Sequence, residues 1–369
     1  MKYIKRFFEC LIQITQCNLK CEYCYVIQEN RRTLKQAEFR YSAEVIKQAL
    51  KQERLGGACY FSICGAGETL MQQGLDEIIK AILENGHYIN ITTNGTYTEG
   101  IDCLLTKLSS DQISRMHISF SFHYIELVRK NLLDVFFDNI AKVKKAGASF
   151  ILQLNLYDGY IDSLDEIKSL SIQKVGALPQ IALTRIEPDM GVSQNTGIYS
   201  KLSYSDYRNE GDKFDSPLFK FTCDNFMVKR KEFCYAGDWA GALNLATGIL
   251  KPCYMSPIEQ NIFEDVLKPI HFNAIGKNCH SPYCSNSSHF LSLGVIPELN
   301  APTYAGLRER REAGWYNSTM REVLNKKLSY TNKMYSKQKQ RIVTIRYRFV
   351  VMYRCFIIQL KRLIKKIAG

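Results

Sequence analysis

The chain has 369 residues, of which 46% are hydrophobic, and it carries a formal net charge of +13. This composition allows one large domain plus a smaller one, and no run of about 18 apolar residues indicates a membrane-spanning helix. The charge does not indicate a nucleic-acid-binding body, because residues 321–369 hold fourteen Lys and Arg against the single acidic residue Glu322 and so account for all of it.

Strand-like and helix-like runs alternate through the first half of the chain. Six strands are predicted, at 11–15, 58–64, 88–93, 116–122, 149–156 and 180–186, with helices between them at 42–54, 74–84, 101–108, 126–145 and 163–170. This alternation predicts right-handed βα units and a parallel sheet. Six units are too few for a closed eight-stranded barrel and suit an α/β fold with a partial, TIM-like (β/α)6 barrel.

Composition divides the chain into four predicted regions. Residues 1–190 form the partial barrel, and residues 191–220, rich in Ser, Asn, Gly, Tyr and Asp, form a linker. Residues 221–296 contain five cysteines and a predicted hairpin that turns at Ala246–Gly248, which indicates a small α+β domain. Residues 297–369 are predicted to be helical and to end in a basic tail.

The interpretation of the thirteen cysteines depends on the cellular compartment in which the protein is expected. The N-terminal stretch "MKYIKRFFECLIQI" is interrupted by Glu9 and has no small-residue cleavage site after it, so we expect no signal peptide and a cytoplasmic protein. In a reducing compartment, clustered cysteines indicate metal ligands rather than disulfides.

Three of these cysteines form a cluster in the stretch "CNLKCEYCY". Cys17, Cys21 and Cys24 have the spacing C-x₃-C-x₂-C and follow the first predicted strand, at the end where parallel barrels build their sites. A four-iron cluster held by three thiolates leaves one iron open to a small chelating ligand. A zinc knuckle or a chance cluster is the alternative interpretation.

This motif, placed in a βα barrel and with Tyr23 just before the third cysteine, resembles that of the radical S-adenosylmethionine (SAM) superfamily. The resemblance implies that the open iron of a [4Fe-4S] cluster binds the amino and carboxylate groups of SAM. It also implies that the reduced cluster cleaves SAM to methionine and a 5′-deoxyadenosyl radical, which abstracts a substrate hydrogen. The reductant would be a protein such as ferredoxin or flavodoxin.

The resemblance extends to the turns after the next two strands. The turn "GAGET" contains Gly65, Gly67 and Glu68, and the family has a glycine-rich turn here whose Glu meets the SAM amino group. Thr69 stands where the family usually has proline. Asn94 belongs to "TTNG", a sequence that is also common in the family at the end of the third strand, and is predicted to bind the cofactor.

Further polar residues lie on the later strands. By resemblance, Ser121 approaches SAM, Gln153 and Asn155 bind its ribose, and His123 faces the substrate. Arg185 faces the SAM carboxylate or the substrate, and it is predicted with His123 to be catalytic. For each of these residues the alternative is a polar side chain satisfied inside the barrel.

A second set of cysteines lies in residues 221–296. Cys234, Cys253, Cys279 and Cys284 follow the pattern C-x₁₃-G-x₄-C … C-x₄-C, which resembles the SPASM/twitch extension of radical SAM enzymes. The resemblance implies a second, auxiliary [4Fe-4S] cluster, in the shorter twitch form. Cys223 is either a replacement ligand or a buried thiol, and a four-cysteine zinc site is the alternative for the set.

The C-terminal residues 341–369 predict a cationic amphipathic helix. Apolar residues recur every three or four positions and basic residues fill most of the rest. The apolar set consists of Ile342, Ile345, Phe349, Met352, Phe356, Leu360, Leu363 and Ile367. Such a helix either lies on an anionic membrane surface, here the inner face of the membrane, or packs on the domain with a solvated basic face.

Three functions remain open at this point. The first is a radical SAM oxidoreductase that modifies a small-molecule or sugar-like cell-envelope substrate, with electron transfer through the auxiliary cluster. The second is a maturase of a ribosomally made peptide, which is less favoured because the first strand is predicted near residue 11 and leaves no room for an N-terminal peptide-recognition domain. The third is a zinc-stabilised interaction protein without activity. No nucleic-acid partner is expected.

Overall fold

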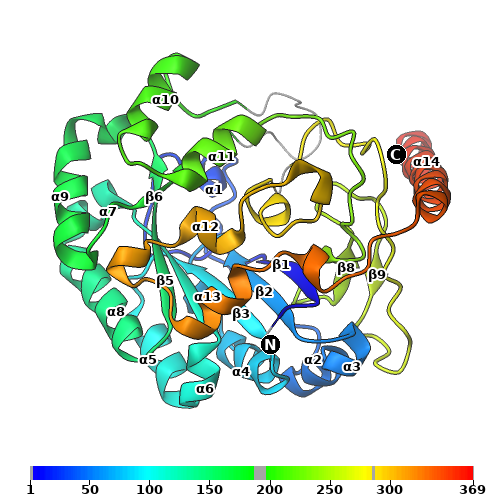
Figure 1. Cartoon of the computed structure of the whole chain (residues 1–369), viewed down its shortest axis with the longest axis horizontal. Helices are drawn as coiled ribbons and strands as arrows, with labels where there is room; N and C mark the ends of the chain where they lie inside the picture. The colour runs from blue at the N-terminus through cyan, green and yellow to red at the C-terminus, as the bar shows by residue number, and fades with distance from the viewer. Residues whose placement is uncertain (1–2, 187–196, 285–286, 369) are drawn as a thin grey trace.

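The computed structural model describes residues 3–186, 197–284 and 287–368. Its centre is one nine-stranded sheet with the order β6-β5-β4-β3-β2-β1-β7-β8-β9 (Figure 1). The strands are β1 (Arg6–Ile12), β2 (Cys59–Gly65), β3 (Tyr88–Thr93), β4 (Met116–Ser121), β5 (Ser149–Leu156), β6 (Gln180–Leu183), β7 (Ala240–Leu243), β8 (Ile249–Lys251) and β9 (Gln260–Asn261). Strands β1 to β6 are parallel neighbours in chain order, which confirms the predicted partial barrel.

The first strand begins earlier than predicted, at Arg6 instead of residue 11. The stretch holds Glu9, and an acidic residue is costly inside a sheet unless it is paired. Here the Glu9 carboxylate lies 2.6 Å from Nδ1 of His289, and only 7% of Glu9 is exposed. The His289 ring also contacts the rings of Phe7 and Tyr304, so it packs among the residues of the barrel.

Helices cover the outer face of the barrel strands (Figure 1). The helices up to β6 are α1 (Tyr25–Gln28), α2 (Ala43–Ala49), α3 (Gln52–Leu55), α4 (Leu75–Glu84), α5 (Thr98–Lys107), α6 (Ser110–Ser114), α7 (Tyr124–Arg129), α8 (Leu133–Lys145) and α9 (Leu164–Val175). The single helix predicted at 126–145 is two, because Asn131 adopts a left-handed conformation with φ of 55° between them.

The region predicted as a linker is partly helical. Helices α10 (Tyr204–Asp212) and α11 (Pro217–Asn225) pack against the barrel. The Tyr207 hydroxyl donates to the Leu156 carbonyl at 2.9 Å, and the Ser216 hydroxyl donates to Gln180 on β6 at 2.7 Å. The polar composition therefore reflects exposed helix faces, while residues 191–196 of the predicted linker lie outside the described residues.

The predicted hairpin exists, but it does not belong to a separate sheet. Strands β7 and β8 are antiparallel, and Gly248 occupies the turn with φ of 75°. Strand β7 also pairs in parallel with β1, so the hairpin continues the barrel sheet.

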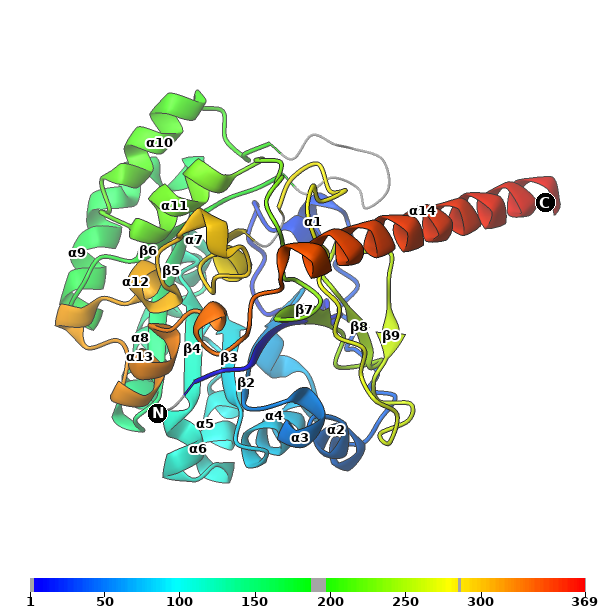
Figure 2. The ribbon, with the colours of Figure 1, turned by 45° about the vertical axis from the view of Figure 1, so that its right-hand side comes forward.

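Residues after 296 are not one tail. Helices α12 (Tyr304–Arg308) and α13 (Ser318–Leu324) belong to a segment that closes the amino ends of the strands. The Trp315 carbonyl accepts from the Phe150 amide at 2.9 Å, and Asn317 donates from its backbone amide to Ser149 at the start of β5. Only α14 (Lys337–Ala368) runs out from the body, as Figure 2 shows. Among the described residues, no helix is both long enough and apolar enough to cross a membrane.

Candidate active site

The barrel is open at the carboxyl ends of its strands. Each of β1 to β6 is otherwise buried but has a partly exposed side chain near this end. We call this set the barrel mouth: Leu11, Cys64, Thr92, Ser121, Gln153, Asn155 and Ala182. The register pairs Leu11 with Cys64, Cys64 with Thr92, and Ser121 with Gln153, so the set shares the inner face of the sheet. Cys64, which belongs to neither cysteine set, therefore lines the open interior.

The loop that follows β1 brings the first three cysteines to this end. Burial, opposed by a backbone hydrogen bond from Leu19 and supported by the charges of Glu68 and Cys24, raises the pKa of Cys17 to about 11. Burial also raises the pKa of Cys21, with additional effects from Cys24 and Cys17. The three thiols are thus close enough to influence one another, as a shared group would require.

Four side chains hold this loop in place. The Asn94 amide donates to Sγ of Cys17 at 3.7 Å, and a terminal nitrogen of Arg32 donates to the Cys17 carbonyl at 2.9 Å. The Lys20 amide donates to the Glu126 carboxylate at 2.7 Å, and the Asn18 amide donates to Thr96 at 2.8 Å. Sequence reasoning singled out Asn94 alone, because nothing local in the sequence shows that the others meet the loop.

Glu68 links the turns after β2 and β3. One carboxylate oxygen accepts from the Leu70 amide at 3.0 Å and the Thr93 hydroxyl at 2.6 Å, and the other accepts from the Asn94 amide at 2.7 Å. Glu68 is only 2% exposed, and burial raises its pKa despite these three donors. These three hydrogen bonds join the turns after β2 and β3, a bracing role that the sequence did not indicate, and the expected contact of Glu68 with SAM stays a prediction.

The two glycines of the "GAGET" turn allow close packing against the loop. A Cβ on Gly67 would lie 2.2 Å from the Gln16 carbonyl oxygen, and one on Gly65 would lie 2.7 Å from the Ile14 side chain. The Gly67 amide donates to the Ile14 carbonyl at 2.6 Å. The close approach seen in the structure is therefore to the chain's own cysteine loop.

Tyr23 and His123 are in direct contact. The Tyr23 hydroxyl lies 2.6 Å from Nδ1 of His123 and 2.9 Å from the Tyr160 hydroxyl. Burial lowers the pKa of His123 to about 4, although the nearby charge of Glu126 opposes this. His123 is thus a neutral ring bonded to Tyr23, and the third member, Tyr160, was not predicted.

The remaining predicted residues lie at the barrel mouth or just beyond it. The side chains of Ser121, Gln153 and Asn155 make no hydrogen bond to any residue that the structure describes, so polar atoms face the opening. Arg185 is exposed beyond β6, and its carbonyl accepts from Gln28 on α1 at 3.2 Å. That bond ties the end of the cysteine loop to the far side of the mouth.

The second cysteine set also converges. Burial raises the pKa of Cys234, and the charges of Cys284, Cys279 and Cys253 add to the effect. Cys234 is held by paired backbone hydrogen bonds with Gly276, each of 3.1 Å. Cys223 lies elsewhere, buried on α11. Burial raises the pKa of its thiol, and the nearby charge of Arg208 opposes this shift.

The donor atoms and the distances between them indicate whether each cysteine set fits a single metal ion or a four-iron cluster. Among the residues described, no three His, Cys, Asp or Glu side chains lie close enough together to hold one metal ion. A four-iron cluster distributes its thiolates over different irons, so it takes cysteines that are further apart than the ligands of a single ion. Buried thiols that influence one another fit such a cluster in both sets.

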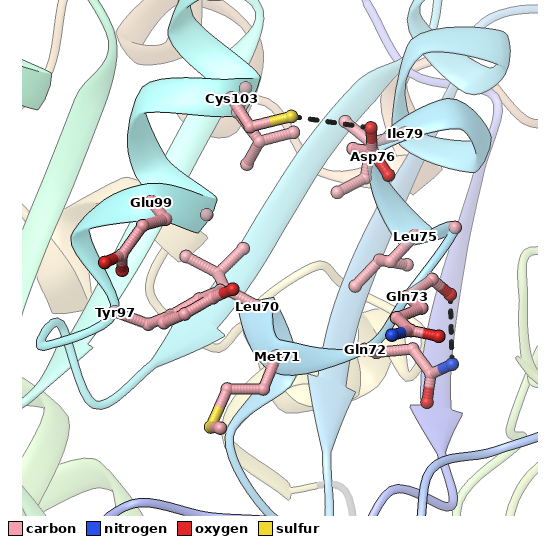
Figure 3. Close-up of a pocket in the computed structure, with 13 residues that line it drawn as sticks. Leu70, Met71, Gln72, Gln73, Leu75, Asp76, Ile79, Tyr97, Glu99 and Cys103 are labelled. Atoms are coloured by element: carbon pink, nitrogen blue, oxygen red, sulfur yellow. Dashed lines mark hydrogen bonds between the residues drawn. The ribbon is translucent and has the colours of Figure 1, made fainter.

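Two pockets lie outside the barrel mouth. Figure 3 shows one of about 250 Å³ between α4 and α5, where the Cys103 thiol donates to Asp76 at 3.5 Å. Another, of about 330 Å³, lies between residues 33–40 and the turn that joins β7 to β8, with Gln13 in its wall. Only the second adjoins the cysteine loop.

Comparison with known proteins finds one matching family model and several similar solved structures. Residues 11–170 match the model of the radical SAM superfamily. SuiB of Streptococcus suis bound to S-adenosylmethionine is similar over 71% of this chain and 65% of its own length, with 16% identity and a TM-score of 0.48. anSMEcpe with bound AdoMet is similar over 93% and 97%, with 15% identity and a TM-score of 0.43. The chain thus spans slightly less than two thirds of SuiB.

Proposed function

We propose that this chain, whose residues 11–170 match the radical SAM model, is a radical SAM enzyme whose cluster is held by Cys17, Cys21 and Cys24. The observation that carries the proposal is the position of these thiols, on a loop at the open end of a parallel partial barrel. Bound there, a [4Fe-4S] cluster with SAM would supply a 5′-deoxyadenosyl radical that takes a hydrogen atom from the substrate.

The chain's own residues position the ligands. Asn94 donates to Cys17, which stabilises a thiolate at that position. Ser121, Gln153 and Asn155 offer hydrogen-bonding groups to the ribose and amino-acid parts of SAM at the barrel mouth. His123 and Tyr160 hold the Tyr23 hydroxyl, so the Tyr23 ring keeps one orientation beside Cys24. We expect Arg185, which is exposed beyond β6, to face a carboxylate of SAM or of the substrate.

The auxiliary set gives the proposed reaction its direction. Cys234, Cys253, Cys279 and Cys284 would complete the coordination of a second [4Fe-4S] cluster, which then has no open iron for the substrate. Such a group relays an electron, which favours oxidation of the substrate. We therefore infer an oxidoreductase of a small-molecule or sugar-like cell-envelope substrate, and a peptide remains the alternative.

Cysteine variants test the cluster assignment. In an anaerobically reconstituted sample, Cys21→Ala should lose about four irons per chain and the part of the reduced electron paramagnetic resonance signal that SAM perturbs. Cys103→Ala, which removes a thiol on α5 away from both sets, is the matched control and should keep both. A SAM-perturbed signal of normal size in Cys21→Ala would contradict the assignment.

A further inference from the structure

Helix α14 carries an apolar stripe on the side that faces solvent. Its members recur every three or four residues and are between 41% and 69% exposed. We call it the outer stripe: Ile342, Ile345, Phe349, Met352, Tyr353, Phe356 and Leu360. A continuous exposed row of large apolar residues is typical of a surface that binds another protein, a membrane or a ligand.

The stripe is not the packing face of the helix, because α14 has a separate face toward the body. Thr344, Tyr347 and Val351 are buried, each at most 8% exposed. The Tyr347 hydroxyl lies 3.1 Å from that of Ser256, and the Thr344 hydroxyl accepts from the Lys277 amide at 3.1 Å. Beyond this contact the helix leaves the body, as Figure 2 shows.

The charges of the helix favour one kind of occupant. Residues 337–368 contain ten Lys and Arg and no acidic residue. At 3.6 residues per turn, Lys339 and Arg346 flank one edge of the outer stripe, while Arg341 and Arg348 flank the other. All four are exposed. A second copy of the helix would bring like charges together, whereas an anionic lipid surface accepts both the stripe and its basic edges.

We propose that α14 docks the protein on an anionic lipid surface, with the outer stripe inserted among the lipids and the basic edges at the headgroups. Arg346, Arg348 and Arg354 lie within the helix, so it rests along the surface and does not cross it. Because Tyr347 on α14 is hydrogen-bonded to Ser256, three residues after Cys253, docking holds the auxiliary cysteine region beside the membrane. The proposal is independent of the reaction.

Vesicle sedimentation with the full-length, reconstituted protein tests the outer stripe. The protein should bind phosphatidylcholine vesicles that contain roughly 30% phosphatidylserine, and it should not bind pure phosphatidylcholine. The pair Phe349→Ser and Phe356→Ser should weaken binding by about tenfold or more. Leu267→Ser, which alters another apolar residue, 91% exposed and outside α14, is the matched control and should bind normally.

A charge variant tests the basic edges. Arg341→Gln with Arg346→Gln should weaken binding several-fold, and about 0.5 M salt should weaken binding of the unaltered protein. The same substitutions at the exposed Lys130 and Lys145 remove two charges from the barrel and should leave binding unchanged. Equal binding of all variants, or equal binding to neutral and anionic vesicles, would overturn the proposal.

A fluorescent variant reports insertion directly. Trp239 and Trp315 are each 1% exposed, so the emission of Phe356→Trp adds a distinct exposed signal. Anionic vesicles should shift that emission to shorter wavelength. If the emission stays unshifted while light scattering shows a dimer that the two Ser substitutions abolish, the stripe is an interface between copies and the proposal is wrong.

Discussion

Replacing Glu68 by glutamine tests whether this residue braces the cysteine loop. The glutamine side chain has one acceptor oxygen, so its amide NH₂ group must face either the Asn94 amide or the Leu70 and Thr93 donors. A hydrogen bond to a charged acceptor contributes about 1.5–3 kcal/mol, and a buried donor without a partner costs a similar amount. We therefore expect Glu68→Gln to lower the free energy of unfolding by about 2–3 kcal/mol.

Denaturant unfolding of the metal-free, reduced chain measures this effect without SAM or iron. Glu77→Gln is the matched control, because its carboxylate is half exposed and pairs with Lys107 at the surface. It should cost at most about 1 kcal/mol. If Glu68→Gln is as stable as the control while SAM binding falls, Glu68 serves the ligand directly and the bracing account is wrong.

Three further predictions follow from the packing. Gly67→Ala should lower both stability, by about 1–3 kcal/mol, and iron content, because its Cβ would press on the Gln16 carbonyl. Gly197→Ala, whose Cβ meets only Ile186 among the described residues, at 3.6 Å, should change neither. Burial lowers the pKa of the His117 ring from 6.5 to about 3. The stability that the neutral buried ring contributes is fully present above pH 6.5, and it is lost as the pH falls from 6.5 toward 3. In pH-dependent unfolding, His117→Phe should therefore reduce the loss of stability between pH 6.5 and pH 4 by about 3 kcal/mol, and an unchanged slope would contradict a buried neutral ring. Tyr347→Phe removes one of the hydrogen bonds that join α14 to the body and should cost about 1 kcal/mol in thermal unfolding, whereas full stability would place the helix elsewhere.

Local patterns were sufficient for most of the barrel. The strands at 88–93 and 149–156 were predicted with their observed bounds, since continuous apolar runs between turn residues indicate buried parallel strands. The first strand was predicted too late in the sequence, because Glu9 is compatible with a strand only when His289, far along the chain, pairs with it. The helices at 204–225 were missed because their exposed faces are polar and their packing is tertiary.

The candidate site shows the same limit. The spacing of the cysteines was sufficient to identify both sets in the sequence, because clustered ligand residues leave a recognisable pattern. The side chains that hold the loop come from distant elements: Glu126 follows β4, and Tyr160 follows β5. No local pattern connects them to Cys17 or Tyr23. The substrate-facing role of His123 stays a prediction. Its contact with Tyr23 depends on the tertiary fold, because the two residues are far apart in the sequence.

Anaerobic SAM cleavage by the full-length protein is the most direct test of the central claim. The reconstituted chain would be incubated with SAM and dithionite, and its iron and sulfide and the 5′-deoxyadenosine formed would be counted. The account predicts about eight irons per chain and 5′-deoxyadenosine that Cys21→Ala does not form. A chain that takes up iron at both cysteine sets but forms no 5′-deoxyadenosine, or one that takes up no iron, would contradict it.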